Sequence, residues 1–213
     1  MSRALVMGGS SGIGLETVKA LLDRGHDVIA FSRGAKNLRL DHPKLVRISG
    51  DATNTEEVRN AVNDADAVIQ ALGVPVNLKL LTGPIDLFSS ATKTLIPIME
   101  EMNIKRLIAV TGFGAGNSNE AINCVQRIPF NVIFGHAYRD KSAQETLIKE
   151  STLNWTIVRP GVLTNQSLKR SYKVRLKPSE WRNGIISRAA VADYIAAAID
   201  DDATIGEEPV LAN

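Results

Sequence analysis

The stretch GHAYRDKSA, residues 135–143, brings three titratable side chains, His136, Tyr138 and Lys141, within two helical turns of one another. A tyrosine hydroxyl can donate a proton, and a histidine, with a reference pKa of about 6.5, transfers protons readily near neutral pH. Tyr138 and Lys141 are spaced to share one face of a helix. The three residues are therefore candidates for a catalytic site, with His136 and Tyr138 as the candidate proton donors. The alternatives are that His136 begins a helix, that Tyr138 is a packed aromatic residue, and that Lys141 is a solvated cation paired with Glu145.

A second candidate for chemistry is the glycine-rich segment VMGGSSGIG, residues 6–14. It follows a short apolar run and precedes an amphipathic one, so it is expected to join a strand to a helix. Glycines there permit a tight turn and let backbone N–H groups approach a pyrophosphate at the positive end of the helix. The segment predicts a dinucleotide-binding turn, in which Gly8, Gly9, Gly12 and Gly14 provide the glycine positions.

The end of the next predicted strand, AFSRG, bears on which dinucleotide binds. A site for NAD normally carries Asp or Glu about 20 residues beyond the glycines, whereas this chain has Ser32 and Arg33. A guanidinium binds a 2′-phosphate in a forked manner and can stack on adenine. We therefore expect NADP, with NAD as the alternative, unless Arg33 is simply a solvated surface residue.

Asp51, in SGDATN, follows the third predicted strand. Its carboxylate can accept a hydrogen bond from the adenine amino group. The alternative is that Asp51 caps the helix expected near Thr55, although Thr53 or Asn54 could supply that cap instead.

Apolar runs of strand length alternate with segments of helical period along the whole chain. The expected strands are residues 3–7, 27–32, 45–49, 67–72, 106–112 and 156–161, with a seventh at 209–213. Between them, Leu15, Val18 and Leu22 share one helical face, and the apolar positions from Phe88 to Met102 share another, with a kink or fresh turn expected at Pro97. This alternation predicts one doubly wound α/β domain over residues 1–213, of the Rossmann type, with a mainly parallel sheet of about seven strands and helices on both faces.

Two segments interrupt the alternation, residues 73–86 and 162–186. Both leave the carboxyl ends of predicted strands, where ligands bind in open α/β sheets. We expect them to form the walls of a substrate site.

Composition narrows the classes of partner. The formal charge of +2 comes without a basic run that could track nucleic acid, and the single cysteine, Cys124, excludes a disulfide within the chain. No Cys/His cluster suggests a metal site, and no apolar stretch approaches the roughly 20 residues needed to span a bilayer. These features predict a cytoplasmic protein with a small-molecule substrate and no nucleic-acid or membrane partner.

Taken in order, GGSSGIG, SRG, GDATN, AVIQALG, VTGFGAG, DKSAQETLIKESTLNWTIVRPG and ISRAAVADYIAAAI resemble the atypical short-chain dehydrogenase/reductase proteins. This NAD(P)-binding group includes NmrA-like and biliverdin reductase B/flavin reductase-like members. The resemblance covers nearly the whole chain.

The resemblance implies a role for each matched position. The pyrophosphate would be held by Gly9, Ser10, Ser11, Gly12 and Ile13, the 2′-phosphate by Arg33, and adenine by Asp51 and Ala52. The cofactor ribose would lie along Ala71, Leu72 and Gly73, and the nicotinamide would contact Thr111, Lys141 and the floor formed by Pro160, Gly161, Val162 and Leu163. In orthodox members a tyrosine four residues before the lysine donates the proton, but that position is Ala137 here. Tyr138, His136, Thr111 and water therefore remain alternative proton sources.

Two functions follow as expectations. The first is an NADPH-dependent oxidoreductase acting on a small quinone, flavin or carbonyl acceptor. The second is a non-catalytic, NADP(H)-sensing regulatory protein of the NmrA-like kind. A monomer and a homodimer both remain open, the latter through the helices expected at 88–102 and 129–149.

Overall fold

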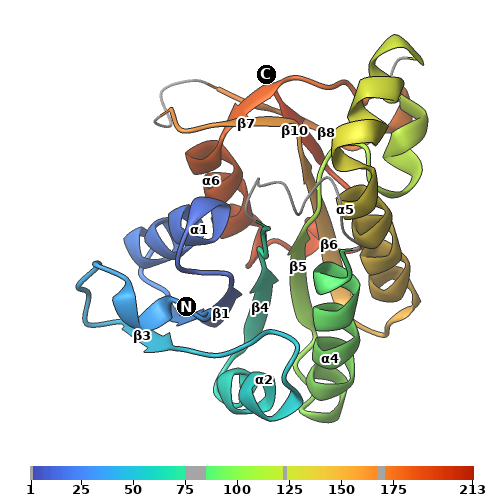
Figure 1. The fold of residues 1–213 in the computed structure, drawn as a ribbon. Coiled ribbons are helices and arrows are strands. Elements are labelled where there is room, and N and C mark those ends of the chain that lie inside the picture. The colour runs from blue at the N-terminus through green and yellow to red at the C-terminus, as the bar shows by residue number, and fades with distance from the viewer. Residues whose placement is uncertain (1, 75–84, 122–123, 167–170) are drawn as a thin grey trace.

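The computed structural model describes residues 2–74, 85–121, 124–166 and 171–213. In these ranges one sheet has eight strands in the order β3-β2-β1-β4-β5-β6-β10-β8 (Figure 1). Its strands are β1 (Arg3–Met7), β2 (Asp27–Phe31), β3 (Leu45–Ile48), β4 (Ala67–Gln70), β5 (Arg106–Val110), β6 (Asn154–Pro160), β8 (Lys173–Arg175) and β10 (Val210–Ala212). Neighbouring strands are parallel except β8, which runs antiparallel to β10. The chain reverses its direction of winding between β1 and β4, where ligands bind in open sheets of this type.

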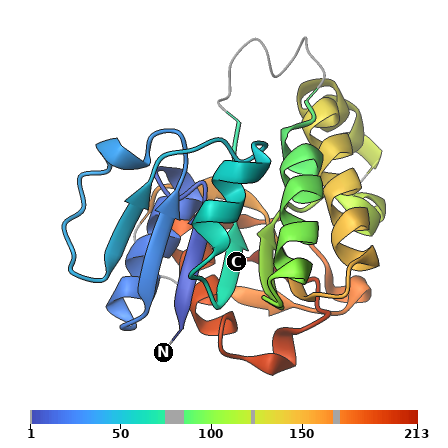
Figure 2. The same ribbon diagram turned by 90° about the horizontal axis from the view of Figure 1, so that it is seen from below.

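Helices cover both faces of the sheet. On one face α1 (Gly12–Asp23) packs against α6 (Arg188–Ala198), and on the other α4 (Leu87–Glu101) lies between α2 (Thr55–Val62) and α5 (Cys124–Glu150) (Figure 1, Figure 2). Four short 3₁₀ turns are η1 (Ala35–Asn37), η2 (Gly116–Ala121), η3 (Pro178–Glu180) and η4 (Asp202–Thr204). None of the helices in the described ranges is long and apolar enough to cross a bilayer.

The alternation of side chains along each strand builds two cores. In β1, Val6 belongs to the core under α1 and α6, whereas Leu5 and Met7 belong to the core under α2 and α4. Successive strand residues point to opposite faces, so a strand covered on both sides must be apolar throughout. The Val- and Ile-rich runs of the sequence satisfy that requirement.

The predicted Rossmann-type fold is confirmed, and each of the seven expected strands is present. Three short strands were not predicted: β8, and the pair β7 (Val162–Thr164) and β9 (Ile185–Ser187), which form a separate parallel sheet. All three lie in or across the end of the segment 162–186, since β9 ends at Ser187. β8 reads Lys-Val-Arg at an exposed edge, so it lacks the apolar run that marks a buried strand.

Two expectations about helices need correction. A kink or fresh turn was expected at Pro97. No fresh helix starts there, because α4 continues through Pro97 as one element with the ring of Pro97 exposed to solvent, and the kink stays a prediction. The alternative that His136 begins a helix was wrong, because α5 begins at Cys124 and His136 lies in the helix interior.

Candidate functional site

The glycine turn lies between β1 and α1, at the carboxyl edge of the sheet. Gly8 has a left-handed φ of +85°, and a Cβ atom there would lie 2.5 Å from the carbonyl oxygen of Ala71. At Gly14 a Cβ would overlap the carbonyl of Gly8. Side chains at these positions would therefore separate the turn from β4 and from its own helix.

The turn leaves the first N–H groups of α1 accessible. Ser11 occupies the N-cap position but its side chain makes no capping hydrogen bond, and the first turn of the helix carries no acidic residue. A Cβ at Gly12 would meet no atom within 4 Å, so open space lies over the turn. An uncapped helix N-terminus beside an open glycine turn fits a pyrophosphate. Ser10, Ser11 and Ile13 lie in the same turn and are partly or fully exposed.

The end of β2 adjoins this turn. A Cβ at Gly34 would lie 3.6 Å from the Ser10 hydroxyl, which places the Ser32–Gly34 corner next to the glycines. Arg33 is exposed, and the buried hydroxyl of Ser32 has no hydrogen-bond partner among the described residues. A guanidinium and an unpaired hydroxyl beside the turn suit a phosphate group.

Asp51 lies across from Arg33 and is not the helix cap. The N-cap of α2 is Asn54, whose side chain accepts hydrogen bonds from the Glu56 and Glu57 amides, so the alternative role for Asp51 was wrong. Asp51 Oδ1 instead accepts from Thr53 N at 2.9 Å and Thr53 Oγ1 at 2.8 Å. These bonds, with a smaller attraction from Arg33, lower the pKa of Asp51.

The predicted catalytic residues divide into two groups. Thr111, Tyr138 and Lys141 come together at the carboxyl end of β5. The Lys141 ammonium donates to the carbonyl of Thr111 and lies 5.0 Å from the Phe88 ring centroid and 5.5 Å from the Tyr138 ring centroid. His136 is exposed, with its ring 3.0 Å from an Arg139 nitrogen, and it is not part of this cluster.

Glycine makes room for Tyr138 at this cluster. A Cβ at Gly112 would lie 2.7 Å from the Tyr138 hydroxyl, so the phenol lies directly against the chain leaving β5. Its aromatic ring also lies under the Lys141 ammonium, with the ring centroid 5.5 Å from the nitrogen. Burial raises the pKa of Tyr138 to about 12.

The pKa of Lys141 is shifted in the opposite direction. Burial lowers its pKa from 10.5 to about 8, against the attraction of Glu145 and Asp140. A cationic acid with a pKa near 8 gives up its proton close to neutral pH, whereas a phenol with a pKa near 12 holds it. Of the two side chains, Lys141 is therefore the stronger acid.

A buried ion-pair network behind the cluster was missed in the sequence. A surface pair between Lys141 and Glu145 was the alternative role for Lys141, but the Glu145 carboxylate is buried and pairs with Arg159, at 2.6 Å from Nη2 and 3.0 Å from Nε. Glu145 also accepts from Thr111 Oγ1 at 2.7 Å. Glu145 and Arg159 lie on separate elements, α5 and β6, and only the fold brings them together.

A carboxylate next to Lys141 caps α4. Asp140 accepts from the amides of Phe88, at 2.8 Å, and Ser89, at 3.2 Å, whereas the local N-cap residue, Asp86, makes no side-chain cap. Asp140 is buried, so this contact fixes the start of α4 against α5.

The remaining predicted positions line the carboxyl edge or lie below it. Ala71 is buried and bonds to β1 through its amide, Leu72 is half-buried, and Gly73 is exposed with open space around its Cα. Ala52 is buried in the core under α2.

The predicted nicotinamide floor follows β6. After the buried Pro160, the chain passes through Gly161 into β7, where Leu163 packs against the core. Val162 is 56% exposed and lies opposite Ile185, which is 55% exposed. Residues 75–84 and 167–170 of the two expected wall segments lie outside the described residues.

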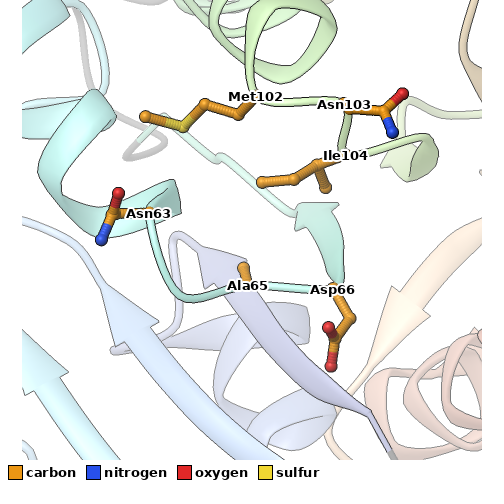
Figure 3. Close-up of a pocket in the computed structure, with 6 residues that line it drawn as sticks. All are labelled: Asn63, Ala65, Asp66, Met102, Asn103 and Ile104. Carbon is orange, nitrogen blue, oxygen red and sulfur yellow. The ribbon is translucent and has the colours of Figure 1, made fainter.

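The hollow drawn in Figure 3, about 490 Å³, lies at the opposite edge of the sheet. It is lined by Asn63, Ala65, Asp66, Met102, Asn103 and Ile104, which precede β4 and β5 at their amino ends. None of these residues belongs to the glycine turn or the Lys141 cluster. In the described ranges no group of His, Cys, Asp or Glu side chains could hold a metal ion.

The sequence of this chain is similar to those of known nicotinamide-binding proteins. A family described as NAD(P)H-binding matches residues 8–202. A 3-beta-hydroxysteroid dehydrogenase of Mycolicibacterium neoaurum is 28% identical over 152 residues, which cover 66% of this chain and 40% of that protein. An uncharacterized chloroplastic protein of Arabidopsis thaliana is 28% identical over 203 residues, covering 92% of this chain and 71% of that protein. The chain thus spans less than half of the steroid dehydrogenase.

Solved structures share the fold over nearly the whole chain. ChuY, an anaerobillin reductase of Escherichia coli O157:H7, superposes with a TM-score of 0.81 at 24% identity, covering 99% of this chain and 96% of that one. A short-chain dehydrogenase/reductase of Veillonella parvula, in complex with NADP, gives a TM-score of 0.83 at 19% identity, covering 100% and 95%.

Proposed function

Because the chain belongs to the NAD(P)H-binding family, we propose that it is an NADPH-dependent oxidoreductase acting on a small quinone, flavin or carbonyl acceptor. One observation carries the proposal: the open glycine turn and the Lys141–Thr111 cluster lie at the same edge of the sheet, after β1 and β5. These strands flank β4, so an extended dinucleotide can lie across its end.

Different residues at this edge bind different parts of the cofactor. Gly8 to Ile13 hold the pyrophosphate, Ser32 and Arg33 the 2′-phosphate, and Asp51 the adenine amino group. Lys141 lies where it can bind the nicotinamide ribose. When bound, the reduced nicotinamide supplies a hydride to the acceptor.

Lys141 is the proposed acid. Its ammonium can deliver a proton to the oxygen or nitrogen that gains charge as the hydride arrives, after which water reprotonates the amine. Tyr138 packs beside it and limits its solvation. His136 takes no part, because it is exposed outside the cluster.

The acceptor is proposed to be flat and partly apolar. Val162 and Ile185 are paired in register on β7 and β9, directly after the end of β6, and both are more than half exposed. Apolar side chains exposed beside a polar site suit the face of an unsaturated ring. The similar proteins include a steroid dehydrogenase and an anaerobillin reductase, which supports a redox reaction.

The test is to incubate the purified protein with NADPH and a panel of quinones, flavins and aldehydes, and to follow NADPH absorbance. We expect oxidation with at least one acceptor and a loss of at least about 100-fold in kcat for Lys141→Met. Tight NADPH binding without turnover of any acceptor would contradict the enzyme proposal.

A sensor of NADP(H) is the second candidate. It is favoured by Ala137, which occupies the position of the orthodox catalytic tyrosine and is buried against Phe88. A sensor would bind NADPH tightly, leave it unoxidised and change its affinity for a protein partner with the redox state of the nucleotide.

A further inference from the structure

The inference concerns the buried carboxylate of Glu145, which touches the proposed acid site from behind. Glu145 is 1% exposed, and each of its oxygens receives an N–H group of Arg159, itself 0% exposed. Arg159 Nη1 lies 2.8 Å from Glu208 Oε2, and its guanidinium lies 5.0 Å from the ring centroid of Trp181. A carboxylate held on both oxygens by a guanidinium remains ionised in the interior.

The charge of Glu145 fixes the direction of the hydrogen bond from Thr111. A hydroxyl has one hydrogen, and an ionised carboxylate can only accept. The 2.7 Å contact therefore directs the Thr111 hydrogen into the protein, toward Glu145. Apart from that hydrogen, the buried Thr111 hydroxyl has only lone pairs, so it can accept a hydrogen bond but has no proton to give.

The loop after β5 closes over this carboxylate. Gly116 has a φ of +52°, and a Cβ atom there would overlap Glu145 Oε2 and lie 2.9 Å from Arg159 Nη2. Its amide donates to the Ser142 hydroxyl on α5 at 2.9 Å. The loop thus keeps solvent from the ion pair without displacing it.

Lys141, one turn before Glu145 on α5, also contacts Thr111. Its ammonium donates to the Thr111 carbonyl and lies near the rings of Phe88 from α4 and Tyr138 from α5. The charged groups that act on it are Glu145 and Asp140, both on α5. Glu145 is thus bonded to the Thr111 side chain and also attracts the ammonium that binds the Thr111 backbone.

Resting on the proposed function, we propose that Glu145 is a positioning residue: clamped by Arg159, it draws the Thr111 hydrogen inward and keeps Lys141 cationic, so that Lys141 and not Thr111 protonates the acceptor. In the step, the acceptor gains a hydride from the nicotinamide and a proton from Lys141. The nicotinamide is oxidised, Lys141 becomes a neutral amine, and water restores its proton.

The first test needs no turnover. The Lys141 side-chain carbon next to the nitrogen is followed by NMR from about pH 6 to 11 in the protein without nucleotide, and its signal is assigned with Lys141→Met. Removing an opposite charge disfavours the cation, so Glu145→Gln should lower the titration midpoint by at least about 0.5 pH unit. Glu150→Gln, which removes an exposed carboxylate from the same helix, is the matched control and should leave it unchanged. Equal midpoints in Glu145→Gln and the native protein would overturn the inference.

The second test keeps the ion pair intact. Thr111→Val should retain NADPH binding, lower kcat less than about tenfold and leave the alkaline limb of the pH profile in place, because no proton comes from Thr111. Thr111→Ser should restore native kcat. If Thr111→Val binds NADPH but is as inactive as Lys141→Met, Thr111 is the donor and the inference is wrong.

The two proposals can fail separately. If none of the tested acceptors supports NADPH oxidation by the native protein, the proposed function fails, while the NMR titration still decides whether Glu145 stabilises the positive charge of Lys141.

Discussion

At the scale of single residues, the proposed contact between Arg33 and the 2′-phosphate of NADPH can be tested without measuring catalysis. Arg33 and the unpaired Ser32 hydroxyl adjoin the glycine turn, and no carboxylate ends β2 to repel a 2′-phosphate. We expect Arg33→Asp to weaken NADPH binding by about 10- to 100-fold and NADH binding by less than about threefold, since only NADPH carries that phosphate. Fluorescence titration with both nucleotides measures the ratio. Arg39→Asp, the same change at another exposed arginine, is the control. Equal losses for the two nucleotides would exclude the phosphate role of Arg33.

At the scale of elements, local patterns in the sequence predicted what depends on neighbours along the chain. The Val- and Ile-rich runs marked β1 to β6 and β10, and the glycine spacing marked the turn into α1, because burial and turn geometry leave local signatures. Asp140, Glu145 and Arg159 left none. Their partners lie on other elements, and a lone Glu four residues after a Lys is typical of an exposed helix. The short strands β7, β8 and β9 were missed because each has only three residues and its partner is distant in sequence: β7 pairs with β9, and β8 pairs with β10.

The start of α4 illustrates such a long-range contact and yields a stability prediction. Asp140 on α5, rather than Asp86, accepts the first amides of the helix. We expect Asp140→Ala to lower the free energy of unfolding by about 1–3 kcal/mol, because two buried N–H groups lose their acceptor. Asp86→Ala should cost less than about 0.5 kcal/mol, since Asp86 is exposed and makes no capping bond. Urea unfolding compares the two variants, and equal losses would show that Asp140 is not the cap.

At the scale of the whole molecule, the sheet order brings together groups from distant parts of the chain. The glycine turn follows β1, Asp51 follows β3 and Lys141 comes from α5, yet all lie around the carboxyl edge because the intervening strands are parallel. Placing Lys141 among Phe88 and Tyr138 at this edge has a cost to folding, because burial disfavours its charge. The burial that lowers the pKa of Lys141 therefore also lowers the stability of the folded protein wherever the unfolded chain keeps this proton.

That cost predicts how stability varies at alkaline pH. The pKa of Lys141 falls from 10.5 to about 8 on folding, so between these values the unfolded chain binds more protons and the free energy of unfolding rises with pH. The pKa values of Tyr138 and Tyr194 are raised to about 12 by burial, and that of Tyr172 is raised too. Above pH 10 the unfolded chain therefore loses phenol protons that the folded protein keeps, and stability falls.

Urea unfolding at successive pH values should therefore show that the free energy of unfolding is greatest at about pH 9 to 10. In Lys141→Met the rise from pH 8 should be lost while the fall above pH 10 remains. An unchanged rise in that variant would show that Lys141 keeps its ordinary pKa in the folded protein, and would remove it as the acid of the site.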